Sequence, residues 1–94
     1  MISAIIMLNV EYGQLTKLTE RLASEPGISE AYTVAGKYDL ILHARLNDNE
    51  ALAELVTERI AKLQGIRSCE TMVAFRVYSK RTLDAGFDLG EDSP

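Results

Sequence analysis

Apolar residues occupy both faces of the stretch from Ile2 to Val10. Its even-numbered positions are all apolar, and Ile5 and Met7 lie between them on the opposite face. Because successive side chains of a β-strand point to opposite sides of the sheet, this pattern predicts a strand that is covered on both faces. We therefore expect Ile2–Val10 to be a central strand of the domain.

Two later stretches follow the 3.6-residue period of a helix with one buried stripe. The first covers residues 14–24 and stops at Pro26, because proline cannot continue the helical hydrogen bonds. The second follows Asn47, which we expect to be its N-cap, with Glu50 in the capping-box position. It ends at Gly65, since glycine favours the left-handed conformation that follows a helix.

Three further stretches have strand patterns, at residues 28–35, 40–46 and 66–78. The predicted order is therefore β-α-β-β-α-β, the α+β arrangement called ferredoxin-like. Right-handed crossovers place both helices on one face of a four-stranded antiparallel sheet.

The other face of that sheet is left open by the chain itself. Ile5, Met7, Tyr32 and Ile41 are expected there, beside His43 and other polar side chains. Because exposed apolar patches of this kind usually mark interfaces, we expect a dimer formed by two open faces, an α/β-barrel-like assembly. A ligand that occupies the open face is the alternative.

Length and charge narrow the possible functions. The 94 residues, of which 47% are hydrophobic, suit one domain, with residues 1–79 folded and the acidic stretch 80–94 expected to be a flexible tail. The net charge of -4 and the lack of a basic block argue against direct nucleic-acid binding. The apolar N-terminus is too short to span a membrane and lacks the basic region of a signal peptide, so we expect a cytoplasmic protein.

Motifs for catalysis or metal binding are missing. The sequence contains no phosphate-binding glycine loop, no HExxH and no CxxC, and it has a single cysteine, Cys69, and a single histidine, His43. We expect no catalytic residue, no metal and no cofactor. The alternative is a small dimeric enzyme of the oxygenase or isomerase type, with His43 or Tyr38 as an acid–base group in a pocket.

The segment Val34–Leu40, VAGKYDL, interrupts the apolar pattern between two predicted strands. It is compatible with a two-residue hairpin turn in which Gly36 supplies a positive φ and Asp39 bonds to local amides. It is equally compatible with a binding site, because free backbone N–H groups suit a carboxylate and the Asp39 carboxylate suits an ammonium group. Both interpretations stay open on the residues alone.

Residues Val34 to Phe75 resemble the effector-binding domain of the Lrp/AsnC transcription regulators, also called the RAM domain. The resemblance rests on the Gly-x-Tyr-Asp turn at residues 36–39, the helix that ends at Gly65-Ile66 and the threonine Thr71 in the last strand. It implies the same βαββαβ fold, dimers that pack through their sheets and rings of dimers such as octamers. It also implies small effectors, typically amino acids, bound at contacts between dimers.

The resemblance assigns site residues one by one. Gly36, Tyr38 and Asp39, with Lys37 inside the same turn, match the segment that frames the α-amino and carboxylate groups of the effector. Thr71 matches the second threonine of the family's common Thr-x-Thr, and Cys69 stands at the first position. These six residues are the predicted ligand-binding set.

The family's helix-turn-helix domain is absent from these residues, so the chain resembles the stand-alone members. We expect a homo-oligomeric sensing module for transcription regulation that binds a small effector and does not bind DNA or a membrane by itself. A full-length Lrp/AsnC regulator is a further possible partner.

Overall fold

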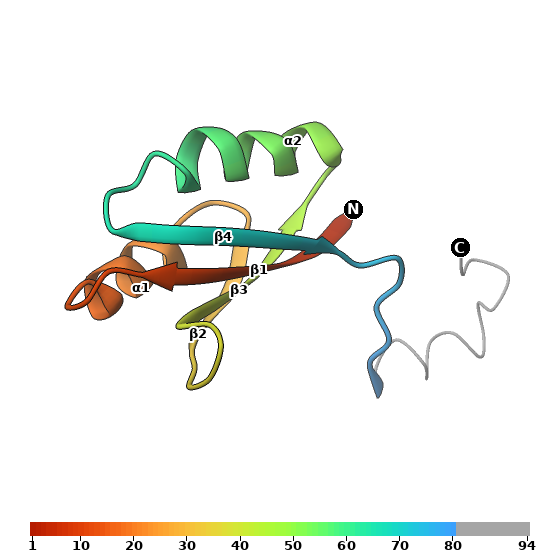
Figure 1. Ribbon diagram of the computed structural model, residues 1–94. Helices are drawn as coiled ribbons and strands as arrows, with labels where there is room; N and C mark the ends of the chain where they lie inside the picture. The colour runs from red at the N-terminus through yellow and green to blue at the C-terminus, as the bar shows by residue number, and fades with distance from the viewer. Residues whose placement is uncertain (81–94) are drawn as a thin grey trace, which may run out of the picture.

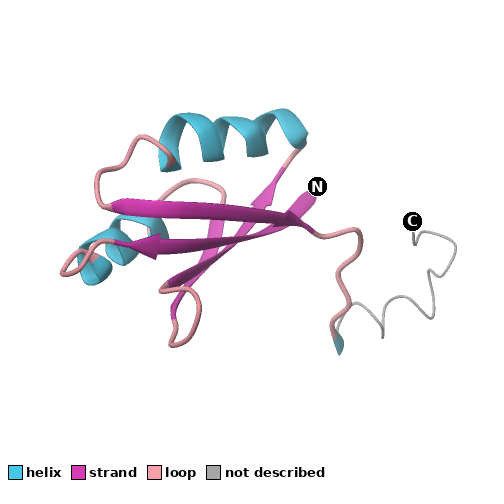
Figure 2. Ribbon diagram, in the orientation of Figure 1, coloured by secondary structure: helices cyan, strands magenta, loops and turns pink. Residues whose placement is uncertain are grey.

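The computed structural model describes residues 1–80 and confirms the ferredoxin-like fold (Figures 1 and 2). The elements, in order, are β1 (Ile2–Val10), α1 (Leu15–Ala23), β2 (Ile28–Thr33), β3 (Leu40–Leu46), α2 (Asn49–Glu54), the π-helical segment η1 (Leu55–Ile60) that continues α2, and β4 (Ile66–Val73). Apart from Lys80, the predicted acidic tail lies outside the described residues.

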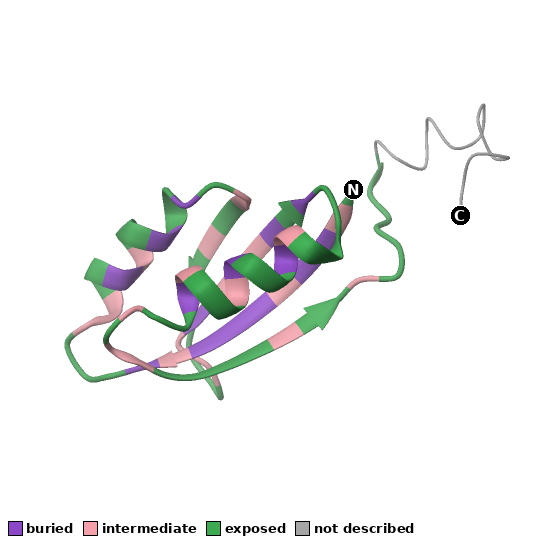
Figure 3. Cartoon of the chain, turned by 90° about the horizontal axis from the view of Figure 1, so that it is seen from above, coloured by how far each residue is buried: buried purple, intermediate pink, exposed green. Residues whose placement is uncertain are grey.

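The four strands form one antiparallel sheet in the order β2-β3-β1-β4, so β1 and β3 are central. Ile6 lies opposite Leu42 of β3 and Thr71 of β4, on the face that the helices cover. Figure 3 shows the buried residues along the central strands and the inner sides of both helices. The side chains buried most completely all belong to this layer: Ile6, Leu8, Leu22, Leu40, Leu42, Leu55 and Ile60.

The opposite face carries the apolar residues expected from the strand pattern. Met7 lies opposite Ile41 on this face, and Tyr32 of β2 lies opposite Ile41 in turn. No helix of the described chain packs there, yet Met7 is only 7% exposed, while Tyr32 and Met72 keep about half of their surface in water at 47% and 51%. The open face therefore has an apolar centre with half-exposed flanks.

Two strands are shorter than the sequence predicts. β4 ends at Val73 instead of Tyr78, because Val73 lies opposite Ala4 and β1 has almost run out: the Ala74 N–H donates to the Ser3 carbonyl at 2.9 Å. β2 ends at Thr33 instead of residue 35. The interpretation as a two-residue hairpin turn is thus wrong. Six residues, 34–39, connect β2 to β3, and Gly36 among them has a φ of 130°.

The cap of the second helix is also shifted by one residue. The side chain of Asp48, not Asn47, accepts the Ala51 N–H at 2.8 Å. Both residue types cap well, so the sequence could not separate them.

A buried carboxylate connects the two helical segments α1 and η1. Glu25, which is 7% exposed after α1, accepts Arg21 Nη1 at 2.6 Å through one oxygen and Arg59 Nη1 of η1 at 2.7 Å through the other. Arg59 also donates to the Pro26 carbonyl at 3.3 Å. The hydrogen bond from Arg21, with that from Arg59, holds the pKa of Glu25 below its usual value in spite of burial. Glu25 therefore fixes the end of α1 against η1.

We predict that Glu25→Ala lowers the free energy of unfolding by about 3 kcal/mol, because it leaves two arginines around an emptied buried site. The matched control is Glu58→Ala, which removes an exposed ion pair to Lys62 at 2.7 Å and should cost less than about 1 kcal/mol. Urea unfolding at one protein concentration measures both. Equal losses for the two variants would contradict the role given to Glu25.

The same two variants should differ in how their free energy of unfolding depends on pH. Since the native pKa of Glu25 is lowered, its contribution is fully present above the ordinary value of 4.5 and is lost as the pH falls below it. Glu25→Ala should flatten the acid side of the stability profile, and Glu58→Ala should not.

Candidate functional site

The candidate site lies where β1 ends. The pairing with β4 shifts register between Asn9 and Val10, and the pairing with β3 ends at Leu8. The chain then turns through Gly13, whose φ is 85°, and the Glu11 N–H donates to the Gly65 carbonyl at 2.7 Å. The Val10 N–H therefore points beyond the last β1–β3 pair and needs an acceptor.

Asp39 supplies that acceptor. Its carboxylate Oδ2 accepts the Val10 N–H at 3.0 Å, and its own N–H donates to the Leu8 carbonyl at 3.0 Å. Its carbonyl accepts the Val34 N–H, also at 3.0 Å, which closes the β2–β3 connection. The other carboxylate oxygen, Oδ1, accepts no hydrogen bond from any residue that the structure describes. One carboxylate oxygen of Asp39 thus stabilises the fold, and the other has no partner among the described residues.

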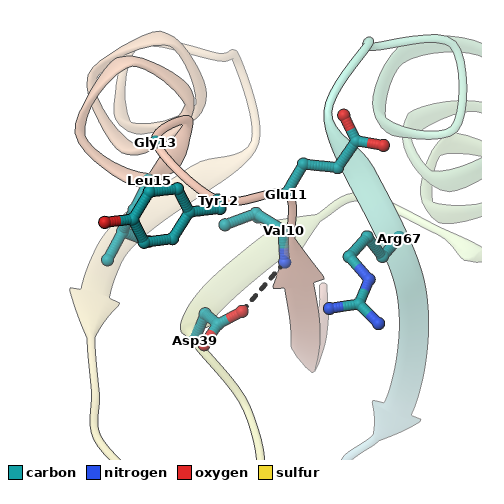
Figure 4. A pocket seen from close by; sticks show the side chains of 7 residues that line it. All are labelled: Val10, Glu11, Tyr12, Gly13, Leu15, Asp39 and Arg67. Carbon is teal, nitrogen blue, oxygen red and sulfur yellow. Dashed lines mark hydrogen bonds between the residues drawn. The ribbon is translucent and has the colours of Figure 1, made fainter.

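A cavity of about 400 Å³ opens beside this carboxylate. Figure 4 shows Asp39 and Arg67 on the two sides of the β1 end, with Val10 between them. The cavity is lined by Val10, Glu11, Tyr12, Gly13, Leu15, Asp39 and Arg67. It has the size of small-molecule sites and combines apolar walls with a few charged groups.

The charged and aromatic groups of the cavity have few partners in the chain. The Arg67 side chain is exposed and forms no ion pair or hydrogen bond with the described residues. Tyr12 is fully exposed at 105% and stands at the side of the cavity that Asp39 occupies. Glu11 lies on the Arg67 side and directs its carboxylate away from Asp39 (Figure 4).

Among the six predicted site residues, only Asp39 lines the cavity. Gly36 stands in open space, and Lys37 Nζ lies 5.8 Å from the centre of the Tyr38 ring. The Tyr38 O–H donates to the Glu70 carboxylate of β4, and this bond raises the pKa of the phenol. The turn is therefore linked to the open-face side of β4.

Cys69 and Thr71 lie on the other side of β4. They sit opposite Leu8 and Ile6, which belong to the core that the helices cover. Burial raises the pKa of the Cys69 thiol, and a hydrogen bond with Thr71 opposes the rise. Within one chain, the structure thus separates Cys69 and Thr71 from the Asp39 cavity.

Sequence reasoning missed Tyr12 and Arg67. The strand and helix patterns gave neither residue a role. The antiparallel pairing of β1 with β4 could have identified them, because this pairing brings the end of the first strand beside the start of the last one. Arg67, the second residue of β4, then has to lie near Val10.

The histidine of the enzyme alternative is not in the cavity. His43 is half-buried on the open face, where its Nδ1 lies 3.0 Å from Ser29 Oγ. Within residues 1–80, no cluster of three or more histidine, cysteine or acidic side chains could hold a metal ion. In the same part of the chain, no helix is long and apolar enough to cross a membrane.

We predict that Asp39→Ala lowers the free energy of unfolding by about 1 to 2 kcal/mol, because the part-buried Val10 N–H loses its acceptor. Asp39→Asn keeps an acceptor oxygen and should cost only a fraction of that. Thermal and urea unfolding measure both variants. If Asp39→Ala were as stable as the wild type, the hydrogen bond from Val10 to Asp39 would not contribute to stability.

Comparison with known proteins gives one consistent family. A family model described as the Lrp/AsnC ligand binding domain matches residues 3–84. The HTH-type transcriptional regulator FL11 of Pyrococcus furiosus is 26% identical over 81 residues, which are 86% of this chain and 53% of FL11. The chain thus spans about half the length of this curated relative.

Solved structures show the same fold. TTHA0845 from Thermus thermophilus is 38% identical with a TM-score of 0.80, and the match covers 85% of this chain and all (100%) of that one. A more distant structure, the transcriptional regulator NMB0573 in complex with L-Met from Neisseria meningitidis, is 14% identical with a TM-score of 0.72 over 83% of this chain and 52% of its own. The latter likeness concerns the fold alone.

Proposed function

Because the chain belongs to the Lrp/AsnC ligand-binding domain family, we propose that it is an effector-sensing and oligomer-forming module that binds an amino acid beside Asp39. The family and the matched relatives are transcriptional regulators and not enzymes, in agreement with the expectation that the chain has no catalytic residue. The regulators of this family are oligomeric and respond to small effectors such as amino acids.

One observation carries the proposal for this chain. Among the described residues, Asp39 keeps one carboxylate oxygen without a partner at the edge of a cavity large enough for a small molecule. A carboxylate in that position suits an ammonium group, and charge-assisted bonds of this kind are among the stronger ones in proteins. The complex of the Neisseria regulator with L-Met is consistent with an amino acid as the effector.

The open sheet face supports the assembly part of the proposal. Two copies that appose their open faces would cover Tyr32 and Met72, which are about half exposed, and the half-buried Ile5 and Ile41. Further contacts between such dimers would build a ring and enclose the cavity at the end of β1. The binding of an effector would then change the stability of the ring.

We propose that these residues do not hold DNA by themselves. The net charge is -4, and the acidic side chains outnumber the basic ones by 14 to 10. Affinity for DNA depends on clustered Lys and Arg that displace counterions from phosphates. A regulatory role would instead pass through co-assembly with a DNA-binding relative in the cytoplasm.

Calorimetry with every common L-amino acid tests the sensing function. At least one should release or absorb heat with the wild type, and Asp39→Asn should abolish that binding while the protein stays folded. At about a hundredfold excess over its Kd, the effector should stabilise the protein by roughly 2.7 kcal/mol. If no amino acid gives heat or a thermal shift with verified oligomer, amino-acid sensing is wrong.

Light scattering tests the assembly. The wild type should have the mass of a dimer or of a multiple of dimers, and Ile41→Glu should shift it to monomer because a charge enters the apolar face. Ala53→Glu adds the same side chain on the exposed side of α2 and is the control. A wild type that is monomeric at micromolar concentration would refute the interface.

A further inference from the structure

The cavity at the end of β1 is lined by a cationic side chain as well as by the Asp39 carboxylate. Arg67 lines it opposite Asp39 and has no ion-pair partner in the described chain, although three other ion pairs form elsewhere. An acid and a base that share one cavity without neutralising each other present two ends of opposite charge. A ligand with both charges would satisfy both.

We propose that Arg67 binds the carboxylate of the effector and that the effector is an α-amino acid with an apolar side chain. The proposal rests on the proposed sensing function and adds to it the orientation and class of the ligand. The ammonium group faces Oδ1 of Asp39, and the carboxylate faces the Arg67 guanidinium, whose planar fork of donors matches a carboxylate.

The alternative partner for the carboxylate is the backbone of the 36–39 turn. The turn reaches the cavity only through Asp39, since neither Gly36 nor Tyr38 lines it. Tyr38 is instead bonded to Glu70 of β4. Among the described residues that line the cavity, Arg67 alone is cationic, and it is therefore the better partner for an anion.

The side-chain preference follows from the remaining walls. Val10 and Leu15 are apolar, and the fully exposed ring of Tyr12 stands beside them on the Asp39 side. An aromatic ring in water gains most from an apolar group laid against it. The Asp39 carboxylate, on the same side of the cavity as Tyr12, disfavours a second carboxylate in the side chain of the ligand. Leucine, methionine and phenylalanine fit these walls, and aspartate does not.

Titration calorimetry with matched probes tests the assignment. Phenylalanine should bind the wild-type oligomer, whereas 3-phenylpropionate and phenethylamine, which each lack one charge, should bind more weakly. Arg67→Gln should weaken phenylalanine binding about 10- to 100-fold and leave the affinity for phenethylamine unchanged. Arg67→Lys should restore part of the loss. Arg76→Gln, an exposed arginine outside the cavity, is the control and should bind as the wild type does.

A second variant tests the apolar wall. Tyr12→Ala should weaken phenylalanine binding and leave alanine binding unchanged, because the alanine side chain is too short to reach the ring. Preference of the wild type for aspartate or lysine over leucine, methionine and phenylalanine would overturn the side-chain class.

The outcomes separate this inference from the function on which it rests. If phenylalanine or leucine binds equally to the wild type and to Arg67→Gln but not to Asp39→Asn, the role of Arg67 is wrong and the sensing function stands. If no amino acid binds the wild type, both are overturned.

Discussion

β1 is apolar on both faces, and this constraint shapes the whole molecule. Its helix-facing side chains, Ile6 and Leu8, are covered by the chain itself, whereas Ile5 and Met7 face a side on which no helix of the described chain packs. A strand of this kind is expected to be central, and we propose that a second copy of the chain covers its other face. The pattern of the first ten residues is therefore the basis of the proposed dimer.

The end of the same strand creates the candidate site. β1 outlasts its pairing with β3, so the Val10 N–H is left to Asp39 at 3.0 Å, and the register shift beside β4 brings Arg67 next to it. This hydrogen bond places the Asp39 carboxylate beside the cavity and uses only one of its two oxygens. We propose that Asp39 serves both the fold and the binding of the effector.

The fold could be predicted from the sequence almost completely, because it depends on local periodicity. The limits of β1 and β3 agree with the pattern to the residue. In contrast, β4 stops at Val73, near the start of β1, and this limit depends on strand pairing that no local pattern contains. Of the six predicted ligand-binding residues, Asp39 alone lines the cavity. Tyr12 and Arg67 are far apart in sequence, and only the register of β1 with β4 brings them to one cavity.

A crystal structure of the assembled protein grown with leucine or phenylalanine tests the central claim most directly. The account predicts an amino acid in the cavity beside Val10, with its ammonium group at Asp39 Oδ1, its carboxylate at Arg67 and its side chain against Tyr12. A neighbouring dimer should close the cavity. A cavity filled by side chains of a neighbouring subunit, or an amino acid bound elsewhere, would contradict it.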